Sequence, residues 1–209
     1  MEAIIFDVDG TLWDSTDEVA VSWNKALRDH SDLDTVLVGA DLEKEFGKPL
    51  DEIMISLFPQ VPEEERNRLK EYLYLYENKW METAPCRVYD KMPETIQHLS
   101  EKYKLFIVSN CQSGYIEAFL KNTGLRNYFT DYTCPGDTGK LKAENIRIIM
   151  ERNHISSAVY VGDTQGDADA CKQAGVNMIY AAYGFGNVKE YYKKIQCFEE
   201  LPDIIEEIE

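Results

Sequence analysis

The chain has no long hydrophobic stretch and is short of positive charge. Its longest apolar runs, residues 105–108 and 176–182, are brief or interrupted and fall far below the roughly 18 residues that a membrane-spanning helix needs. Lys and Arg number 22 against 38 Asp and Glu, which gives a formal net charge of −16. We therefore expect no membrane association and no nucleic-acid partner, because clustered Lys and Arg bind a phosphate backbone.

The sequence also lacks paired cysteines and a targeting segment. Its five cysteines, at positions 86, 111, 134, 171 and 197, form no C-x-x-C pair, which argues against a disulfide framework or a zinc site. The N-terminus runs from Met1 and Glu2 directly into an apolar segment, without the basic and cleavage regions of a signal peptide. We expect a cytoplasmic protein with reduced thiols.

The order of the predicted elements indicates the fold class. Residues 3–6 form a short apolar run, and from residue 87 onward short apolar runs alternate with segments of helical periodicity. This alternation is typical of a doubly wound parallel α/β sheet. The first run and the later units predict one core domain, residues 1–14 and 86–209.

A helical block separates the first strand from the rest of the core. Ser15 to Glu18 reads as a capping box, so we expect a helix from Thr16, and residues 16–84 look entirely helical. Further helices are expected at 41–46, 50–57 and 62–80. The last should have one apolar face, made of Leu69, Leu73, Tyr76 and Trp80. Residues 15–85 are thus predicted to be an all-helical insertion.

Polar residues follow three of the predicted strands. Asp7 and Asp9 come after the first strand, Ser109 and Asn110 after another, and Asp163 and Asp167 lie in the loop after residues 158–161. Ligands of open parallel sheets bind at the carboxyl ends of strands, so we expect these groups to meet. Four carboxylates at close range require a compensating cation, and oxygen ligands favour Mg²⁺.

Such a site can bind and transfer a phosphoryl group. The Ser109 hydroxyl, main-chain N–H groups of residues 8–10 and a lysine can bind phosphate oxygens. A carboxylate facing phosphorus can attack it, and a second carboxyl two residues along can move the proton. The lysine is Lys140 or Lys142, since both precede the helix expected from residue 143.

These segments resemble the four motifs of haloacid dehalogenase-type phosphatases. The matching segments are D-V-D-G-T-L from Asp7, V-S-N ending at Asn110, a lysine before a helix, and G-D-T-x-x-D ending at Asp167. They occur in the family's order and span essentially the whole chain, with the insertion resembling the family's small helical cap. Residues 183–186 and the Cys111-Gln112 pair also resemble the phosphoglycolate phosphatase-like branch.

The resemblance implies a role for each matching residue. Asp7 is implied as nucleophile and metal ligand, and Asp9 as general acid/base that binds metal through its main-chain carbonyl. Asp163 is implied as a direct Mg²⁺ ligand and Asp167 as a supporting one. The phosphate-binding group is implied to comprise Ser109, Asn110, Gly10 and Thr11.

Two lysines have less certain assignments. Lys142 is favoured over Lys140 for the third motif because it stands immediately before the helix, although the lysine-proline form common in relatives is absent. Lys48, in a Gly-Lys-Pro break between two cap helices, is a candidate contact to the leaving group, with a solvent-exposed lysine as the alternative.

The leading functional hypothesis is a Mg²⁺-dependent phosphatase that hydrolyses a small phosphorylated metabolite through an aspartyl-phosphate on Asp7. A phosphomutase of the same superfamily is the nearest alternative, because it would use the same groups. A non-catalytic phospho-acceptor module is a third hypothesis, which the helical insertion disfavours. We expect a monomer or a weak dimer.

Overall fold

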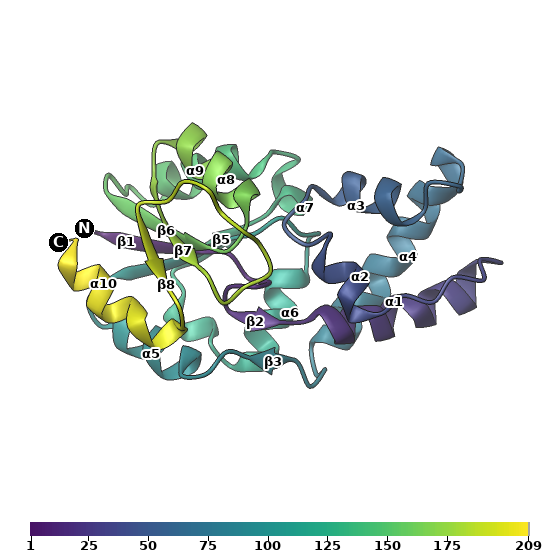
Figure 1. Cartoon of the computed structure of the whole chain (residues 1–209), viewed down its shortest axis with the longest axis horizontal. Coiled ribbons are helices and arrows are strands. Elements are labelled where there is room, and N and C mark those ends of the chain that lie inside the picture. Colours follow the sequence, from purple (N-terminus) through teal and green to yellow (C-terminus); the bar gives the residue numbers. More distant parts are fainter. Residues whose placement is uncertain (209) are drawn as a thin grey trace.

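The core of the molecule is a six-stranded parallel sheet. The computed structural model describes residues 1–208, and its strands lie in the order β5-β4-β1-β6-β7-β8 (Figure 1). All neighbouring pairs in this sheet are parallel. The predicted doubly wound α/β fold is therefore confirmed. The strands are β1 (Ala3–Phe6), β4 (Lys104–Val108), β5 (Asp131–Thr133), β6 (Ala158–Gly162), β7 (Asn177–Ala181) and β8 (Lys193–Ile195).

Alternate side chains of each central strand enter two separate cores. In β1, Ile4 and Phe6 join one apolar cluster, whereas Ala3 and Ile5 join the other. Because both faces are buried, the strand reads as a continuous apolar run. Figure 1 shows α8 (Lys142–Arg152) and α9 (Gln165–Ala174) on one face, with α5 (Met92–Ser100) and α10 (Leu201–Glu207) on the other.

Four helices form a cap at the end of the molecule opposite the termini (Figure 1). They are α1 (Thr16–His30), α2 (Gly39–Glu43), α3 (Leu50–Leu57) and α4 (Glu63–Met81). Helix α1 packs along α4 and also contacts α2, and α4 contacts the core helix α6 (Tyr115–Thr123). All four lie within the segment 15–85 that the sequence predicts as an insertion.

Two short strands that the sequence analysis did not predict join the cap to the core. β2 (Trp13–Asp14) and β3 (Arg87–Val88) pair antiparallel, at the points where the chain leaves and re-enters the core. Trp13 is fully buried, with its ring 4.9 Å from that of Phe119 in α6. The β2–β3 pair, which forms the hinge of the cap, is therefore anchored in the core.

Helix α1 begins at Thr16 as predicted, but the contacts that cap it differ from the prediction. The Ser15 side chain makes no capping hydrogen bond, so the predicted capping box is wrong. The Asp14 carboxylate instead accepts hydrogen bonds from the Thr16 N–H and hydroxyl groups, at 3.2 and 2.7 Å. The Ser15 hydroxyl donates to Asp9 at 2.5 Å, so a residue expected to cap a helix serves the core loop.

Other parts of the cap also depart from the prediction. Residues 31–38 are not helical, and α2 covers Gly39–Glu43 rather than 41–46. The buried face of α4 consists of Leu69, Leu73, Glu77 and Met81, and Trp80 is 40% exposed. The face is rotated from the predicted one because the i, i+4 row that begins at Leu69 and Leu73 continues through a glutamate.

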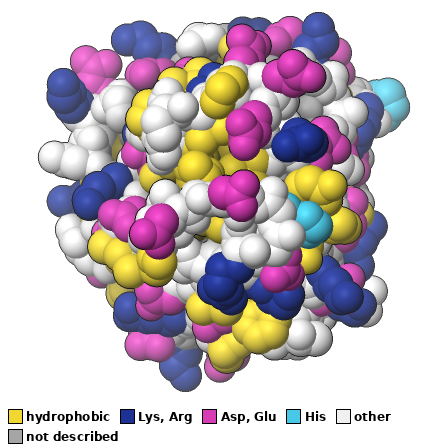
Figure 2. Space-filling model, turned by 90° about the vertical axis from the view of Figure 1, so that its right-hand side faces the viewer, with side chains coloured by type: hydrophobic (Ala, Val, Ile, Leu, Met, Phe, Trp, Pro, Cys, Tyr) yellow, Lys and Arg dark blue, Asp and Glu magenta, His cyan; other side chains and the backbone are white. Residues whose placement is uncertain are grey.

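The surface of the cap end carries charges of both signs. Figure 2 shows acidic and basic side chains interspersed there, with hydrophobic side chains between them. This face therefore has no continuous basic field of the kind that binds nucleic acid. Among the helices of residues 1–208, none has the length and apolar character to span a bilayer.

We expect the central strands to dominate stability. Ile107 in β4 is fully buried in the core cluster, so Ile107→Ala should lower the free energy of unfolding by about 2–5 kcal/mol. Val36, 77% exposed, provides a control, and Val36→Ala should change it by less than about 0.5 kcal/mol. Urea denaturation followed by circular dichroism measures both, and equal effects would contradict the assigned core.

Candidate active site

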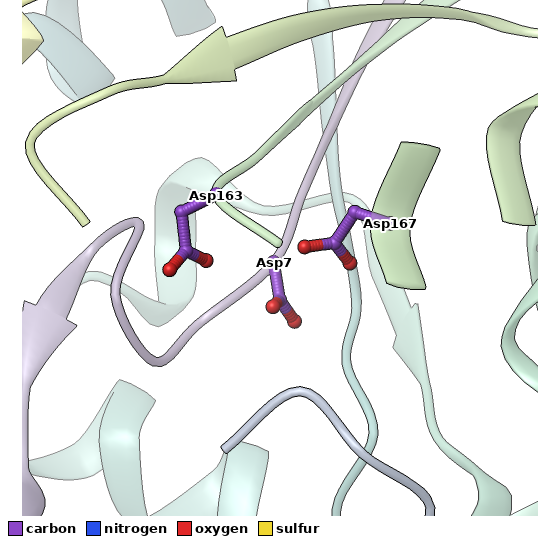
Figure 3. A group of neighbouring side chains, drawn as sticks. All are labelled: Asp7, Asp163 and Asp167. Atoms are coloured by element: carbon purple, nitrogen blue, oxygen red, sulfur yellow. The ribbon is translucent and has the colours of Figure 1, made fainter. Parts of the chain in front are cut away.

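Three adjacent strands direct their following loops to one point. β1 lies between β4 and β6. The residues directly after β1, β4 and β6 are Asp7, Ser109 and Asp163, respectively. Figure 3 shows the side chains of Asp7, Asp163 and Asp167 as close neighbours, with Asp167 coming from α9. The site thus lies at the centre of the sheet, where the parallel strands end.

The three aspartates form a buried acidic cluster. One carboxylate oxygen from each lies within 4.8 Å of the others, and none of the three residues is more than 2% exposed. Burial raises the pKa of Asp7 to about 7, with Lys142 and Ser109 acting to lower it. Burial also raises the pKa of Asp163, and the charges of Asp167 and Asp7 add to the shift. The cluster therefore requires positive charge.

Lys142 supplies part of that charge. Its ammonium is buried, 2.5 Å from Asp167 Oδ1 and 3.1 Å from Asp7 Oδ1. Burial acts to lower the pKa of Lys142, but the two carboxylates outweigh it and the pKa rises. The contact with Asp7 lacks hydrogen-bond geometry: in the described part of the chain, no group donates to Asp7 Oδ1. That oxygen remains open to a further ligand.

Asp167 is fully committed to contacts within the protein. Its Oδ1 accepts from Lys142 and, at 3.3 Å, from the Tyr160 hydroxyl, while its Oδ2 accepts from the Thr164 N–H and hydroxyl. Burial opposes ionisation, but Lys142 and Thr164 lower the pKa of Asp167. The ionised carboxylate orients Lys142 and caps α9, which agrees with a supporting rather than a direct ligand role.

Asp163 is held by the loops on either side of it. The Thr11 hydroxyl donates to Oδ1 at 3.2 Å and the Phe185 N–H to Oδ2 at 2.8 Å. A Cβ atom at Gly10, whose φ is +78°, would lie 2.2 Å from Asp163 Oδ2, and one at Gly184 would lie 2.4 Å from its Cβ. Both positions require glycine because the carboxylate occupies the adjoining space.

Asp9 lies beside Asp7 and collects three hydrogen bonds on one oxygen. Its Oδ1 accepts from Ser15 Oγ at 2.5 Å, Tyr115 OH at 2.6 Å and Trp13 Nε1 at 2.9 Å. Burial raises the pKa of Asp9 although these donors act to lower it. A carboxyl group with a raised pKa suits proton donation to a leaving group.

A small cavity separates these groups from the cap. It admits about 30 Å³ of water-sized volume, enough for one or two water molecules. Its core side includes Asp7, Asp9, Ser109 and Asn110. The Asn110 amide donates to the Gly47 carbonyl of the cap at 2.9 Å, which ties the cap to the core beside the cavity. Because the cavity is so small, we expect the cap to move when a substrate binds.

Some residues predicted for the site lie outside the cavity lining. The Gly10 N–H donates to the Trp13 carbonyl, and the Thr11 hydroxyl serves Asp163. Lys48 pairs with Glu45 at 2.8 Å and borders a different surface cavity. Lys140 is exposed and lies 3.9 Å from Glu144. The structure thus brings Lys142, and not Lys140, to Asp7.

Other residues of the cavity were absent from the sequence analysis as site residues. They are Trp23, Phe46, Leu50, Ile53 and Glu77 of the cap, with Gln112 and Tyr115 of the core. Most are apolar or aromatic residues whose helical spacing indicates only packing. Glu77 offered a signal, because it follows Leu73 by four residues and precedes Met81 by four. Glutamate is rarely buried unless it is paired.

The donor set fits a hard divalent cation. Asp7 Oδ1 has no hydrogen-bond donor among residues 1–208, and the charges of Asp167 and Asp7 add to the burial that raises the pKa of Asp163. Carboxylate oxygens with this unsatisfied charge are the ligands that Mg²⁺ prefers. Asp7 and Asp163 would hold the ion. The Asp9 side chain is outside the cluster.

A parallel α/β sheet with buried carboxylates at the ends of its central strands is typical of enzymes that hydrolyse phosphate compounds. The model of the haloacid dehalogenase-like hydrolase family matches residues 4–181, and the chain belongs to that family. A phosphoglycolate phosphatase of Aquifex aeolicus is 30% identical over 201 residues, covering 88% of this chain and 86% of the relative. The sequence-based prediction of an enzyme of this family, a phosphatase, is confirmed.

Solved structures agree with the fold. A predicted phosphatase of Clostridium acetobutylicum superimposes with a TM-score of 0.83 at 25% identity, covering 99% of this chain and 98% of its own. A predicted phosphoglycolate phosphatase of Haemophilus somnus gives a TM-score of 0.84 at 21% identity, with 98% of each chain covered. The cap and core elements together therefore have counterparts in known structures.

The two lysines should behave differently when each is replaced by methionine. Lys142→Met removes the buried cation from Asp7 and Asp167, so kcat should fall on the order of 100-fold or more for every substrate. Lys140→Met, at an exposed site, should change kcat less than about twofold. Steady-state kinetics on p-nitrophenyl phosphate measures both. A collapse in Lys140→Met with a mild effect in Lys142→Met would reverse the assignment.

Stability without metal should fall as pH rises. The pKa values of Asp7 and Glu77 are raised to about 7, so between about pH 4 and 7 the folded protein binds more protons than the unfolded chain. In EDTA, Tm should therefore decrease from pH 5 to pH 8. Mg²⁺ should raise Tm more at pH 8 than at pH 5, because Asp7 is then ionised. Thermal unfolding at both pH values tests this, and an equal Mg²⁺ effect would contradict it.

Proposed function

We propose that the protein is a Mg²⁺-dependent phosphatase that hydrolyses a small phosphate monoester through an aspartyl-phosphate on Asp7. The observation that carries the proposal is the position of Asp7. Its Oδ1 is buried, lies 3.1 Å from the Lys142 ammonium and receives no hydrogen bond from residues 1–208. A carboxylate in this environment is available both to a metal and to phosphorus.

The chain's own residues account for each chemical step. An Asp7 oxygen attacks phosphorus, the bond from phosphorus to the leaving oxygen breaks, and Asp9 gives that oxygen its proton. In the second step Asp9 takes a proton from water, the water oxygen attacks phosphorus, and inorganic phosphate leaves Asp7. Lys142 and Ser109 interact with the phosphoryl oxygens, over which the negative charge is spread in the transition state.

Mg²⁺, when bound by Asp7 and Asp163, neutralises charge on the phosphoryl oxygens and on the nucleophile. Asp167 keeps Lys142 in place, and Thr11 with Phe185 fixes the direction of Asp163. The main-chain carbonyl of Asp9 remains a proposed additional ligand. Holding these groups rigidly before the substrate arrives is what lowers the barrier.

The cap restricts which molecules react. The small cavity leaves room for few water molecules, and we expect the cap to move to admit a substrate. We expect a small phosphorylated metabolite in the cytoplasm and a monomeric or weakly dimeric enzyme. A phosphomutase of the same superfamily would use the same residues but would return the phosphoryl group to the product.

The test is p-nitrophenyl phosphate with and without Mg²⁺. We expect steady release of p-nitrophenol and inorganic phosphate in equal amounts, lost with EDTA. Asp7→Asn should reduce kcat by at least about 100-fold because an amide is a poor nucleophile, whereas Asp203→Asn at an exposed position should not. A single stoichiometric burst would instead indicate a phospho-acceptor, and retention of activity in Asp7→Asn would contradict the assigned nucleophile.

A further inference from the structure

A buried acid of the cap faces the candidate active site. Glu77 lies in α4 on the row of Leu69, Leu73 and Met81, and it is only 5% exposed. Its side chain borders the same cavity as Asp7 and Asp9. Burying a carboxyl group costs free energy unless the group is bound by partners, so its position at the cavity needs an explanation.

The contacts of Glu77 place its carboxyl group where the cap meets the core. The Trp23 indole N–H of α1 donates to Glu77 Oε2 at 2.5 Å. The next residue, Asn78, donates to the Ser113 carbonyl at 2.8 Å and accepts from the Gln112 amide at 3.0 Å. These bonds fix this turn of α4 above the core loop that follows β4.

The cavity has an uneven distribution of charge. Among its lining residues in the described chain, the ionisable side chains with acidic character are Asp7, Asp9 and Glu77, and there is no Lys, Arg or His. Lys142 lies behind Asp7 and serves the phosphoryl side. Lys48, the nearby cation of the cap, pairs with Glu45 and borders another cavity. Within residues 1–208, the lining therefore offers no cationic side chain that could bind a second anionic group of the substrate.

The phosphoryl group, bound at Asp7, directs the rest of the substrate toward the cap. There it meets the aromatic and aliphatic side chains of Trp23, Leu50 and Ile53, with Glu77 as the acid among them. A carboxylate on the leaving group would be desolvated beside a second acid. An ammonium or hydroxyl group would instead donate a hydrogen bond to Glu77.

We infer that Glu77 is a specificity-determining residue that selects phosphate monoesters of small amino alcohols and rejects those whose leaving group carries a carboxylate. The inference rests on the proposed hydrolysis of phosphate monoesters by this site. The inferred preference differs from the substrate in the name of relatives such as the Aquifex aeolicus phosphoglycolate phosphatase, because phosphoglycolate carries a carboxylate on its leaving group.

The preference holds for either protonation state of the glutamate. Burial raises the pKa of Glu77 to about 7, while Gln112 and Trp23 act to lower it. As a neutral acid it accepts a hydrogen bond from an ammonium or hydroxyl group through its carbonyl oxygen. As a carboxylate it adds charge attraction for an ammonium. In the ionised state it repels a carboxylate, and in the neutral state it supplies no charge to offset one.

The first experiment compares three substrates of similar size on the wild-type enzyme with Mg²⁺: O-phosphoethanolamine, propyl phosphate and 2-phosphoglycolate. We expect kcat/KM for phosphoethanolamine to exceed that for phosphoglycolate by at least about tenfold, the range that one charge-assisted hydrogen bond supplies. Propyl phosphate, without charge on its leaving group, should lie between them. An equal or greater kcat/KM for phosphoglycolate would overturn the inference.

The second experiment removes the acid. At pH 8, where Glu77 is ionised, Glu77→Gln should lower the ratio of phosphoethanolamine to phosphoglycolate kcat/KM by about fivefold or more, because the amide keeps the shape but loses the charge. Glu71→Gln, an exposed position on the same helix, controls for the change in net charge and should leave the ratio unaltered. An unchanged ratio in Glu77→Gln with normal folding would exclude a role for Glu77 in selection.

Binding to an inactive enzyme separates this inference from the proposed function. Isothermal titration calorimetry on Asp7→Asn with Mg²⁺ gives the affinity for phosphoethanolamine and phosphoglycolate without turnover. If none of the three esters is hydrolysed by the wild type, the proposed function fails, and the order of affinities still decides the inference. The same order decides it if Glu77→Gln does not fold, since tighter binding of phosphoglycolate would contradict selection by an acid.

Discussion

The site depends on one buried cation, the ammonium of Lys142, held between Asp7 and Asp167. Three carboxylates within 4.8 Å cannot remain ionised in a buried space without positive charge. The lysine stabilises the ionised Asp167, and Asp167 in turn keeps the lysine directed at Asp7. One negative oxygen of Asp7 is left without a donor in the described structure, which suits a metal and a reacting phosphorus. The remaining contacts of the site preserve this arrangement.

The acid/base candidate is tied to the hinge of the cap. The Asp9 carboxyl accepts from Trp13 and Ser15 at the exit of the core and from Tyr115 at the start of α6. Trp13 also belongs to the β2–β3 pair through which the chain enters and leaves the cap. Trp13 and Tyr115 are themselves buried in the core, so the Asp9 carboxyl is held at the base of the cap by residues that are fixed to the core.

Cap and core contribute different properties to the same cavity. The core supplies Asp7, Asp9, Ser109 and Asn110, all close to the ends of the central strands. The cap supplies an aromatic and aliphatic wall with one buried acid, Glu77. If the proposed roles hold, the reaction chemistry and the leaving-group preference belong to separate parts of the chain. Substitutions in α1, α3 and α4 would then change the preference without altering the cluster of Asp7, Asp163 and Asp167.

The sequence by itself determined the α/β class and which strands the site residues follow, because apolar periodicity and short polar loops are local features. It predicted four clustered carboxylates, of which Asp7, Asp163 and Asp167 form the cluster and the Asp9 side chain lies outside it. It could not determine which groups touch. The sequence favoured Lys142 over Lys140 by its place before the helix, but only the direction of the first turn of α8 shows that Lys142 meets Asp7. Ser15 has the local pattern of a helix cap but bonds to Asp9. Glu77 lines the cavity because α1 and α4 pack over the core. This burial depends on the tertiary structure and could not be predicted from the local sequence.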